Sequence, residues 1–385
     1  MKRFWNDRRI VALSVLLLVA TVLVLTWYLL IAVHPAGPWN PLPPGKTPVA
    51  VAVGTIHRVG PEVTWPPTWT PTPTGTATST PTITPTPTST PTRRPPTPTN
   101  TPDPRLSYYI TRLRKRAYKG GTVEITGDIP HNEDYAAYYI SYPSGNLTIT
   151  GYMYVPQGQG SFPVIILNHG AYDPEMYFTG TGTQREADYL ARHGYLAIAP
   201  DYRNYGESTA GDSLLLVGYM TDVLNLVNSV ETIDKADPSR IGMWGHSMGG
   251  GVAIKACVVS DRIKAVALFG SVSADEKDNY YWNGVTRLKI HQIFGLPERN
   301  PGTYAWLSAV RYLDVAPPMS IHHGEADDIV PIEFSEKLGQ RMLEAGRSVE
   351  YFTYPGQPHT FQGEAWELAM ERVLRFFDKY VGRRS

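Results

Sequence analysis

Cysteine is almost absent from this chain, because Cys257 is the only thiol among 385 residues. A single cysteine excludes an internal disulfide framework, so a stable domain has to rely on its hydrophobic core. Cys257 lies in the apolar segment 253–259, where we expect it to act as a small buried hydrophobic residue.

The chain also lacks an excess of charge of either sign, with 35 basic and 35 acidic residues. No basic stretch is interleaved with aromatic residues, which argues against nucleic acid as a partner. Metal-binding patterns are missing as well, since the sequence has no H-E-x-x-H motif and no clustered Cys/His spacing. The adjacent His322 and His323 would point to opposite faces of a strand. We therefore expect no metal and no cofactor.

One long apolar run is present, at residues 10–33, and it follows a basic start at residues 1–9. Its 24 uncharged residues are enough to cross a bilayer. The run exceeds the apolar core of a cleavable signal peptide, and no clear A-x-A cleavage site follows it. This pattern favours an uncleaved transmembrane anchor over a cleaved signal. The basic flank predicts a cytoplasmic N-terminus and an extracytoplasmic location for the rest of the chain.

Residues 34–104 are dominated by threonine and proline. Such a composition cannot build a core, so we expect this linker to be disordered and to prefer extended polyproline II. Two interpretations stay open: a semi-rigid stalk that holds the next domain away from a membrane, and a solvated tether without another role. Residues 105–385 remain, which is a suitable length for one large domain.

Strand and helix signals alternate along residues 105–385. Strands are predicted at 122–129, within 137–155 as a hairpin with its turn at 144–146, and at 163–168, 195–199, 241–244, 265–269, 320–322 and 349–353. Helices are predicted at 184–192, 213–233, 250–259, 333–345 and 364–380. Apolar strands that alternate with helices predict an α/β fold with a mostly parallel sheet covered on both faces. Functional residues gather at the carboxyl ends of the strands in such sheets.

The segment Gly-His-Ser-Met-Gly at residues 245–249 matches the G-x-S-x-G pattern of a nucleophile elbow. The five-residue pattern is weak by itself, and a glycine-rich turn capped by a serine is the alternative. Its context is stronger, because an apolar strand signal precedes it and a helix of small residues follows. We therefore expect Ser247 to be a nucleophile that the turn exposes to substrate.

A serine hydroxyl needs a base to take its proton, and the base is usually a histidine that a carboxylate orients. Two later strands end near Asp327 and His359. The order Ser247, Asp327, His359 predicts a catalytic triad in the order of the α/β-hydrolases. Two alternatives remain at this stage: Asp327 or Asp328 caps the helix that starts near Pro331, and His359 is an ordinary loop histidine.

An oxyanion hole needs two backbone N–H groups that point at the substrate carbonyl oxygen. Met248 follows the serine and is expected to supply one. The second is expected from Ala171, or else from Tyr172, in the loop after the strand at 163–168. Tyr172 is also a candidate substrate-binding residue. Trp282 is another, in a predicted small cap at about 273–318, although the aromatic residues of this insertion can instead pack the cap onto the sheet.

These motifs resemble those of the α/β-hydrolase superfamily. The resemblance is carried by the segments 168–170, 201–208, 240–251 and 323–331 and by the loop of His359. They are most similar to the catalytic domain of the prolyl oligopeptidase family of serine peptidases, with dienelactone hydrolases and acyl esterases as relatives. The resemblance covers about residues 137–380.

The resemblance implies a serine hydrolase that cleaves small esters or short peptides through an acyl-enzyme. Peptidase and carboxylesterase remain alternatives, because the motifs serve both activities. Asn204 departs from the family, which usually has glycine at this turn. A larger departure is the predicted anchor and stalk, since family peptidases usually carry a β-propeller before this domain. A catalytically silent binding module on the same fold is a further alternative, although all three triad residue types are present.

Overall fold

The computed structural model describes residues 103–130 and 133–382. The predicted cytoplasmic start, the anchor and all but the last two residues of the predicted linker lie outside the described residues. Within residues 103–130 and 133–382, none of the helices combines the length and the apolar character that crossing a membrane requires.

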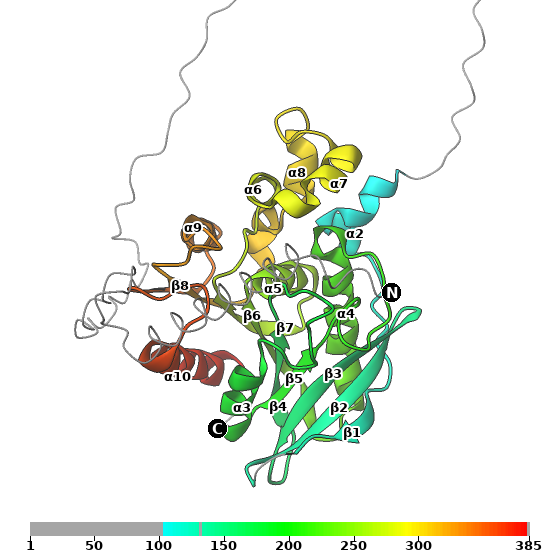
Figure 1. Cartoon of the computed structure of the whole chain (residues 1–385), viewed down its shortest axis with the longest axis vertical. Helices are drawn as coiled ribbons and strands as arrows, with labels where there is room; N and C mark the ends of the chain where they lie inside the picture. The colour runs from blue at the N-terminus through cyan, green and yellow to red at the C-terminus, as the bar shows by residue number, and fades with distance from the viewer. Residues whose placement is uncertain (1–102, 131–132, 383–385) are drawn as a thin grey trace, which may run out of the picture. The chain divides into compact units, whose positions relative to one another are not determined.

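A nine-stranded sheet forms the centre of the described part of the chain (Figure 1). Its strands are β1 (Glu124–Asp128), β2 (Tyr135–Ser144), β3 (Leu147–Pro156), β4 (Phe162–Asn168), β5 (Leu196–Pro200), β6 (Ala236–His246), β7 (Ile263–Phe269), β8 (Met319–Gly324) and β9 (Val349–Tyr354). Their order is β1-β2-β3-β5-β4-β6-β7-β8-β9. Six strands, β4 to β9, run parallel to one another. The pairs β1–β2, β2–β3 and β3–β5 are antiparallel. The predicted mostly parallel α/β sheet is therefore confirmed.

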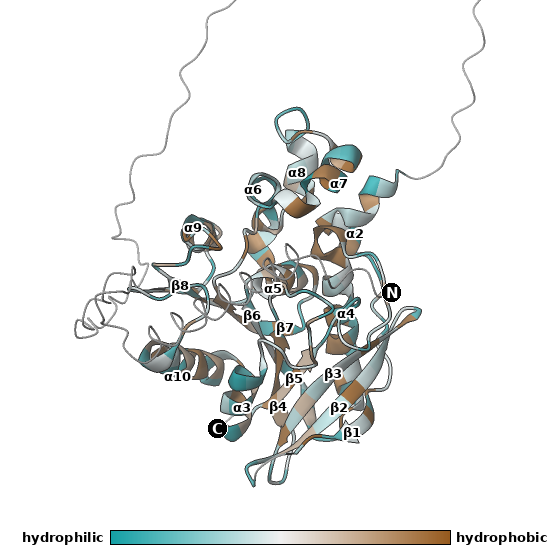
Figure 2. Ribbon diagram, in the orientation of Figure 1, coloured by the Kyte–Doolittle hydropathy of each residue, from teal (hydrophilic) through white to brown (hydrophobic). Residues whose placement is uncertain are grey.

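Helices cover both faces of this sheet. The main ones are α3 (Gln184–Arg192), α4 (Val217–Ser229), α5 (Met248–Val259), α9 (Glu333–Glu344) and α10 (Gly363–Tyr380). Two separate hydrophobic clusters follow from this arrangement: α4, α5 and α9 contribute to one, and α3 and α10 to the other. The outward side of α3 is hydrophilic in Figure 2, as expected for a helix that buries only Glu186, Ala187, Leu190 and Ala191.

Burial explains where strands form in the sequence. Every residue of β4 and of β5 is buried, which suits parallel strands with helices on both sides. The hairpin strand β2 instead alternates between buried and more exposed positions over much of its length. It pairs with β3 from Tyr135 to Ser144, and Gly145 adopts a φ of 66° in the predicted turn.

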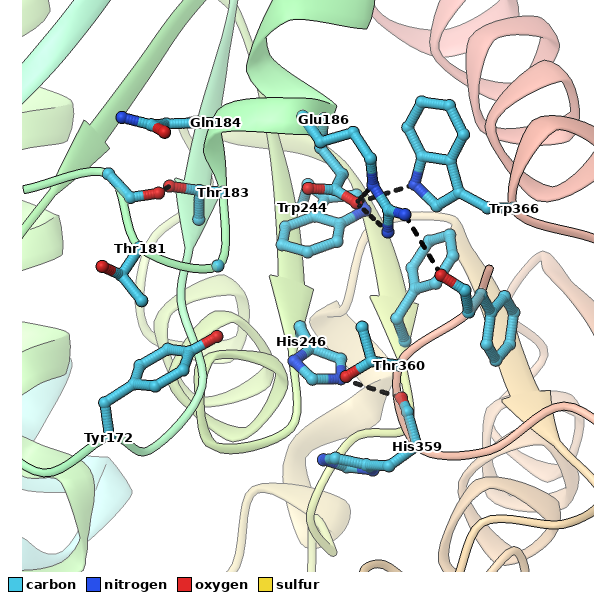
Figure 3. A pocket seen from close by; sticks show the side chains of 15 residues that line it. Tyr172, Thr181, Thr183, Gln184, Glu186, Trp244, His246, His359, Thr360 and Trp366 are labelled. Carbon is cyan, nitrogen blue, oxygen red and sulfur yellow. Dashed lines mark hydrogen bonds and ion pairs between the residues drawn. The ribbon is translucent and has the colours of Figure 1, made fainter. Parts of the chain in front are cut away.

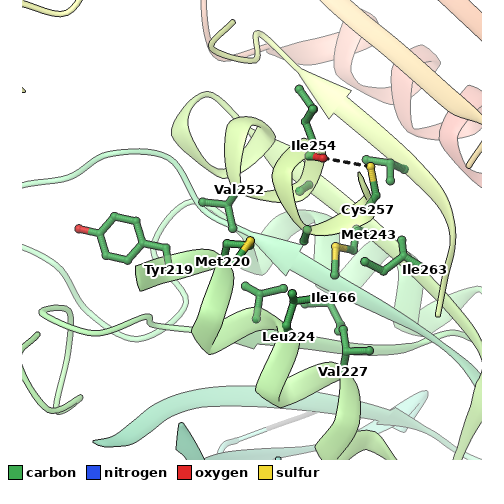
Figure 4. Close-up of a cluster of buried hydrophobic side chains, with 14 of the residues drawn as sticks. Ile166, Tyr219, Met220, Leu224, Val227, Met243, Val252, Ile254, Cys257 and Ile263 are labelled. Atoms are coloured by element: carbon green, nitrogen blue, oxygen red, sulfur yellow. Dashed lines mark hydrogen bonds between the residues drawn. The ribbon is translucent and has the colours of Figure 1, made fainter. Parts of the chain in front are cut away.

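Figure 4 shows the larger cluster between α4, α5 and the sheet. Met220 and Leu224 from α4 pack there with Ile254 from α5 and Met243 from β6, and all four are fully buried. Cys257 belongs to the same cluster and is buried, as its apolar surroundings predicted.

One prediction about a helix needs correction. The helix expected at 213–233 is interrupted, because Leu215 and Leu216 adopt left-handed φ values of 54° and 59°, and α4 begins only at Val217. The predicted cap is a set of short helices: α6 (Glu276–Trp282), α7 (Gly284–Phe294), α8 (Pro301–Leu307) and η4 (Ala309–Val315). All four come between β7 and β8 in the chain, and α6, α7 and α8 lie together in Figure 1. A buried ion pair of 2.8 Å between Lys255 of α5 and Glu276 of α6 ties the cap to the domain.

Candidate active site

The candidate site lies at the carboxyl ends of adjacent parallel strands. Ser247 directly follows β6, and the loop 169–172 follows β4. Asp327 follows β8, and His359 follows β9. Because β4, β6, β7, β8 and β9 are neighbours with one direction, their carboxyl ends share one edge of the sheet. The topology thus brings segments from four distant parts of the sequence to one place.

Ser247 occupies a strained backbone conformation, with φ 55° and ψ −119°. A Cβ on Gly249 would come 2.0 Å from the Asn168 carbonyl oxygen, and one on Gly245 would come 2.6 Å from the Gly249 carbonyl oxygen. Both positions therefore require glycine, as the elbow interpretation expected. Strain held by such close packing is common at functional sites. The side chain of Ser247 is mostly covered, with an exposed fraction of 8% for the residue.

Asp327 and His359 contact each other directly, with 2.7 Å between Asp327 Oδ2 and His359 Nδ1. The other oxygen, Oδ1, accepts hydrogen bonds from the N–H groups of Ile329 (3.0 Å) and Val330 (2.9 Å). Asp328 is exposed. The N-cap residue of α9 is Ile332, so the alternative that Asp327 caps the start of this helix is wrong.

Electrostatics favour an ionised Asp327. Burial disfavours the carboxylate, but hydrogen bonds from His323, from His359 and from the Val330 N–H outweigh burial and hold the pKa of Asp327 below its usual range. An ionised Asp327 can only accept, so His359 Nδ1 carries the proton. The lone pair of His359 is then at Nε2, the atom that a general base must present to a serine.

Ser247 lies close to this pair through its chain neighbours. The ring of His246 is 4.5 Å from the ring of His359, and its Nε2 donates to the His359 carbonyl oxygen at 3.0 Å. The Ser247 N–H donates to the Phe269 carbonyl oxygen. Gly270 follows Phe269, and a Cβ on Gly270 would come 3.0 Å from both Asp327 Oδ2 and His359 Nδ1. Within the described residues no hydrogen bond joins the Ser247 hydroxyl to His359, a contact that often tightens only when substrate binds.

The predicted oxyanion donors also lie near the serine. Met248 is the first residue of α5, so its N–H has no acceptor within that helix. In the loop after β4, a Cβ on Gly170 would come 3.3 Å from Ser247 Cβ. The N–H groups of Ala171 and Tyr172, which follow Gly170, make no hydrogen bond to another part of the described chain. Both therefore stay candidates for the second donor.

A cavity of about 310 Å³ opens beside His359 (Figure 3). Tyr172 and His359 belong to its lining and Ser247 does not, so Tyr172 stays a candidate substrate-binding residue. Trp282 does not belong to its lining: its Nε1 donates to the Ile329 carbonyl at 3.1 Å, and its ring packs against Phe334. In the cap, Tyr280, Phe294 and Tyr304 are buried, so these aromatic residues serve packing.

Three further histidines lie near the site, and the sequence analysis did not predict the contacts of His246 and His323. His246 contacts His359, and His323 places Nε2 3.1 Å from Asp327 Oδ2 while its Nδ1 lies 2.6 Å from Ser335 Oγ. His169 is buried under the loop after β4, and burial lowers its pKa to about 4. The i,i+4 spacing of His323 and Asp327 was the available signal for their contact.

Residues 181–384 match the prolyl oligopeptidase family. The match covers more than half of the chain, which decides the assignment. The chain belongs to the prolyl oligopeptidase family. Proteins similar to this chain carry the names of peptidases and of esterases.

A puromycin-hydrolysing peptidase of Mycobacterium tuberculosis is similar in structure, with a TM-score of 0.56 and 22% identity, over 66% of this chain and 41% of that one. Acetyl xylan esterase 1 of Thermoanaerobacterium sp. has a TM-score of 0.54 and 15% identity, over 71% and 94% of the two chains. These two likenesses show the fold. The esterase FrsA of Enterobacter sp. is 24% identical over 256 residues, 61% of this chain and 54% of that protein. The matched parts span 38 to 54% of the length of the first curated relatives and of FrsA.

Proposed function

We propose that this protein hydrolyses ester or amide bonds through an acyl-enzyme on Ser247, with His359 as the base and Asp327 as its orienting carboxylate. The observation that supports this most is the 2.7 Å contact of Asp327 with His359 Nδ1 beside the strained turn of Ser247. Together they supply a nucleophile, a base with a free Nε2 and a carboxylate held in its ionised form.

In the proposed reaction, the Ser247 hydroxyl oxygen attacks the substrate carbonyl carbon while His359 Nε2 takes the hydroxyl proton. The N–H groups of Met248 and of Ala171, or Tyr172 in its place, stabilise the oxygen anion of the tetrahedral intermediate. His359 then gives its proton to the departing alcohol or amine, which leaves the acyl group on the serine. Water attacks this ester with His359 again as the base and releases the acid.

Esters are the better substrates in our proposal. The likeness to acetyl xylan esterase 1 extends over 94% of that chain, whereas the likeness to the puromycin-hydrolysing peptidase extends over 41% of it. The cap of about 273–318 is too small to enclose a chamber, so discrimination should come from the pocket. Activated esters also need less protonation of their leaving group than amides do.

The test is kcat/KM for short acyl nitrophenyl esters compared with aminoacyl and prolyl anilides, on wild type and Ser247→Ala. We expect measurable ester hydrolysis, slower or absent anilide cleavage, and a loss of about 10⁶-fold in kcat for the variant. Efficient anilide cleavage with a marked residue preference would make the peptidase the primary reading. Activity that survives Ser247→Ala would refute the assigned nucleophile.

For the N-terminal region, we propose a single transmembrane anchor at 10–33 and a Thr/Pro-rich linker at 34–104 that holds the hydrolase domain outside the cytoplasm. The support is the length of the apolar run, its basic flank and the composition of the linker. A surface location would give the domain access to small extracytoplasmic esters or peptides.

A further inference from the structure

The cavity beside His359 has polar atoms that the proposed triad does not use. It lies against the ends of β6 and β7, the start of α3 and the segment before α10. Aromatic side chains form much of its wall, namely Tyr172, Trp244, Phe269, Phe361 and Trp366. Its volume of about 310 Å³ is at the lower end of the range for small-molecule pockets. A group about the size of one sugar ring is therefore what it can hold.

Glu186 carries the clearest sign of an absent partner. This residue of α3 is only 5% exposed, and its carboxylate lines the cavity. Its Oε1 accepts from Arg185 Nε (3.2 Å), Arg185 Nη2 (3.0 Å) and Trp366 Nε1 (2.7 Å). Its Oε2 accepts no hydrogen bond from the described residues. A carboxylate can accept about four hydrogen bonds shared between its two oxygens, so three donors on one oxygen leave the other available.

Two further groups in the wall are unpaired. Because His246 Nε2 donates to the His359 carbonyl, its Nδ1 carries a lone pair, and burial lowers the pKa of His246 to about 4, which keeps the ring neutral. Trp244 Nε1 is buried and has no hydrogen-bond partner among the described residues. The cavity thus offers two acceptor atoms, Glu186 Oε2 and His246 Nδ1, that take no hydrogen bond from the described residues, and Trp244 Nε1 lies buried in its wall without a partner.

The charges of this cavity cancel. Arg185 pairs with Glu186, with its guanidinium over the ring of Trp366 at 4.3 Å, and its Nη1 donates to the Phe361 carbonyl at 3.2 Å. The neutral His246 adds no charge. A ligand selected by net charge is therefore disfavoured. A hydroxyl donates to such acceptors without adding a charge, so hydroxyl groups match this cavity better than an ammonium or a carboxylate does.

We propose that this cavity binds an uncharged, hydroxylated ring of the substrate, with Glu186 Oε2 as the specificity-determining acceptor for one ring hydroxyl. The substrate class is then an ester of a sugar or a similar polyol. The apolar faces of the wall cover the ring, and His246 Nδ1 serves a further hydroxyl. This inference rests on the proposed serine hydrolase function and names the substrate class of the same site.

The experiment compares three esters on the full chain: an acetylated methyl pyranoside, cyclohexyl acetate and 4-nitrophenyl acetate. Cyclohexyl acetate has a ring of similar size without hydroxyls. Glu186→Gln keeps an oxygen for Arg185 and Trp366 and replaces the free acceptor by an amide donor. Glu371→Gln, on the exposed side of α10, is the matched control.

We expect wild type to favour the pyranoside ester over cyclohexyl acetate by about 10-fold or more in kcat/KM, the scale of a hydrogen bond to a charged acceptor. Glu186→Gln should remove this preference by lowering kcat/KM for the pyranoside ester about 10-fold more than for cyclohexyl acetate or 4-nitrophenyl acetate, while Glu371→Gln behaves as wild type. An equal loss on all three esters would show that Glu186 is only structural and would overturn the proposal. So would an unchanged preference, or a preference for aminoacyl esters that Glu186→Gln abolishes.

If the proposed hydrolase function itself is wrong, the hydrolysis of all three esters will be independent of Ser247. Binding of the unesterified methyl pyranoside to Ser247→Ala, measured by calorimetry, separates the two. Heat that Glu186→Gln abolishes supports the subsite even if the reaction is not the proposed one. Absence of binding, together with equal rates on both ring esters in wild type, overturns it.

Discussion

Replacing Asp327 by asparagine is the most informative single change at the candidate site, because it alters a charge and a donor while keeping the shape. The N–H groups of Ile329 and Val330 both donate to Oδ1, so the amide oxygen of the new side chain should take that position. Its NH₂ group then replaces Oδ2. The new NH₂ donor then faces His359 Nδ1 and His323 Nε2, two nitrogens that donated to the Asp327 carboxylate.

The magnitude follows from the tautomer. To accept from the new amide, His359 must move its proton from Nδ1 to Nε2, and the base can then no longer take the serine proton. The expected loss in kcat is about 10⁴-fold, or about 5 kcal/mol in activation free energy. Loss of the contact with His323 should lower the free energy of unfolding by only about 1 kcal/mol, because His323 Nε2 keeps its hydrogen bond to the Val330 carbonyl at 3.0 Å.

The assay is kcat and KM on 4-nitrophenyl acetate, with urea unfolding of the same samples. Asp328→Asn is the control, because Asp328 is exposed and its replacement should leave both kcat and stability near wild type. A kcat for Asp327→Asn within 10-fold of wild type would refute the tautomer reasoning. Damage by Asp328→Asn with a harmless Asp327→Asn would refute the assignment of the acid itself.

Three further predictions concern stability and location. Lys255→Met should cost about 3 to 5 kcal/mol in urea unfolding, because Glu276 is left buried and unpaired, and Lys255→Met combined with Glu276→Leu should recover most of this loss. A greater loss in the double variant would contradict that. Burial lowers the pKa of His169 to about 4, so its stabilising contribution is complete above pH 6.5 and falls by about 3 kcal/mol as the pH drops to 4. The free energy of unfolding should depend less steeply on pH in His169→Gln than in His193→Gln, which changes an exposed histidine as a control. Equal slopes in the two variants would contradict this role of His169. The full chain should sediment with membranes, and protease outside intact cells should release an active domain. Soluble protein that starts near residue 34 would instead indicate a cleaved signal.

Much of the sheet was predictable because burial leaves a direct mark on sequence. The apolar runs of β4 and β7 and the amphipathic spacing of α3 locate these elements to within about two residues. Left-handed leucines leave no such mark, and Leu215 and Leu216 delay the start of α4 to Val217 although the sequence favoured a helix from residue 213. Tertiary packing holds them there against their intrinsic preference.

The site was predictable only in part, for a related reason. The order of Ser247, Asp327 and His359 is a pattern along the chain, and the fold explains why their loops meet. The contact of His246 with His359 joins residues 113 positions apart and depends on the register of the parallel strands. The same holds for Glu186 and Trp366, which are 180 positions apart. A local sequence pattern cannot predict such pairs. For this reason the sequence analysis named Trp282 as a pocket residue and missed Glu186, which lines the cavity.

The central claim is that Ser247 is an activated nucleophile, and covalent labelling tests it most directly. The folded protein is treated with a fluorophosphonate probe, digested, and the modified peptide is identified by mass spectrometry. Our account predicts a single label on Ser247, at a rate that drops strongly in His359→Ala and disappears in Ser247→Ala. No label on the folded wild-type protein, or a label on another residue that survives Ser247→Ala, would contradict it.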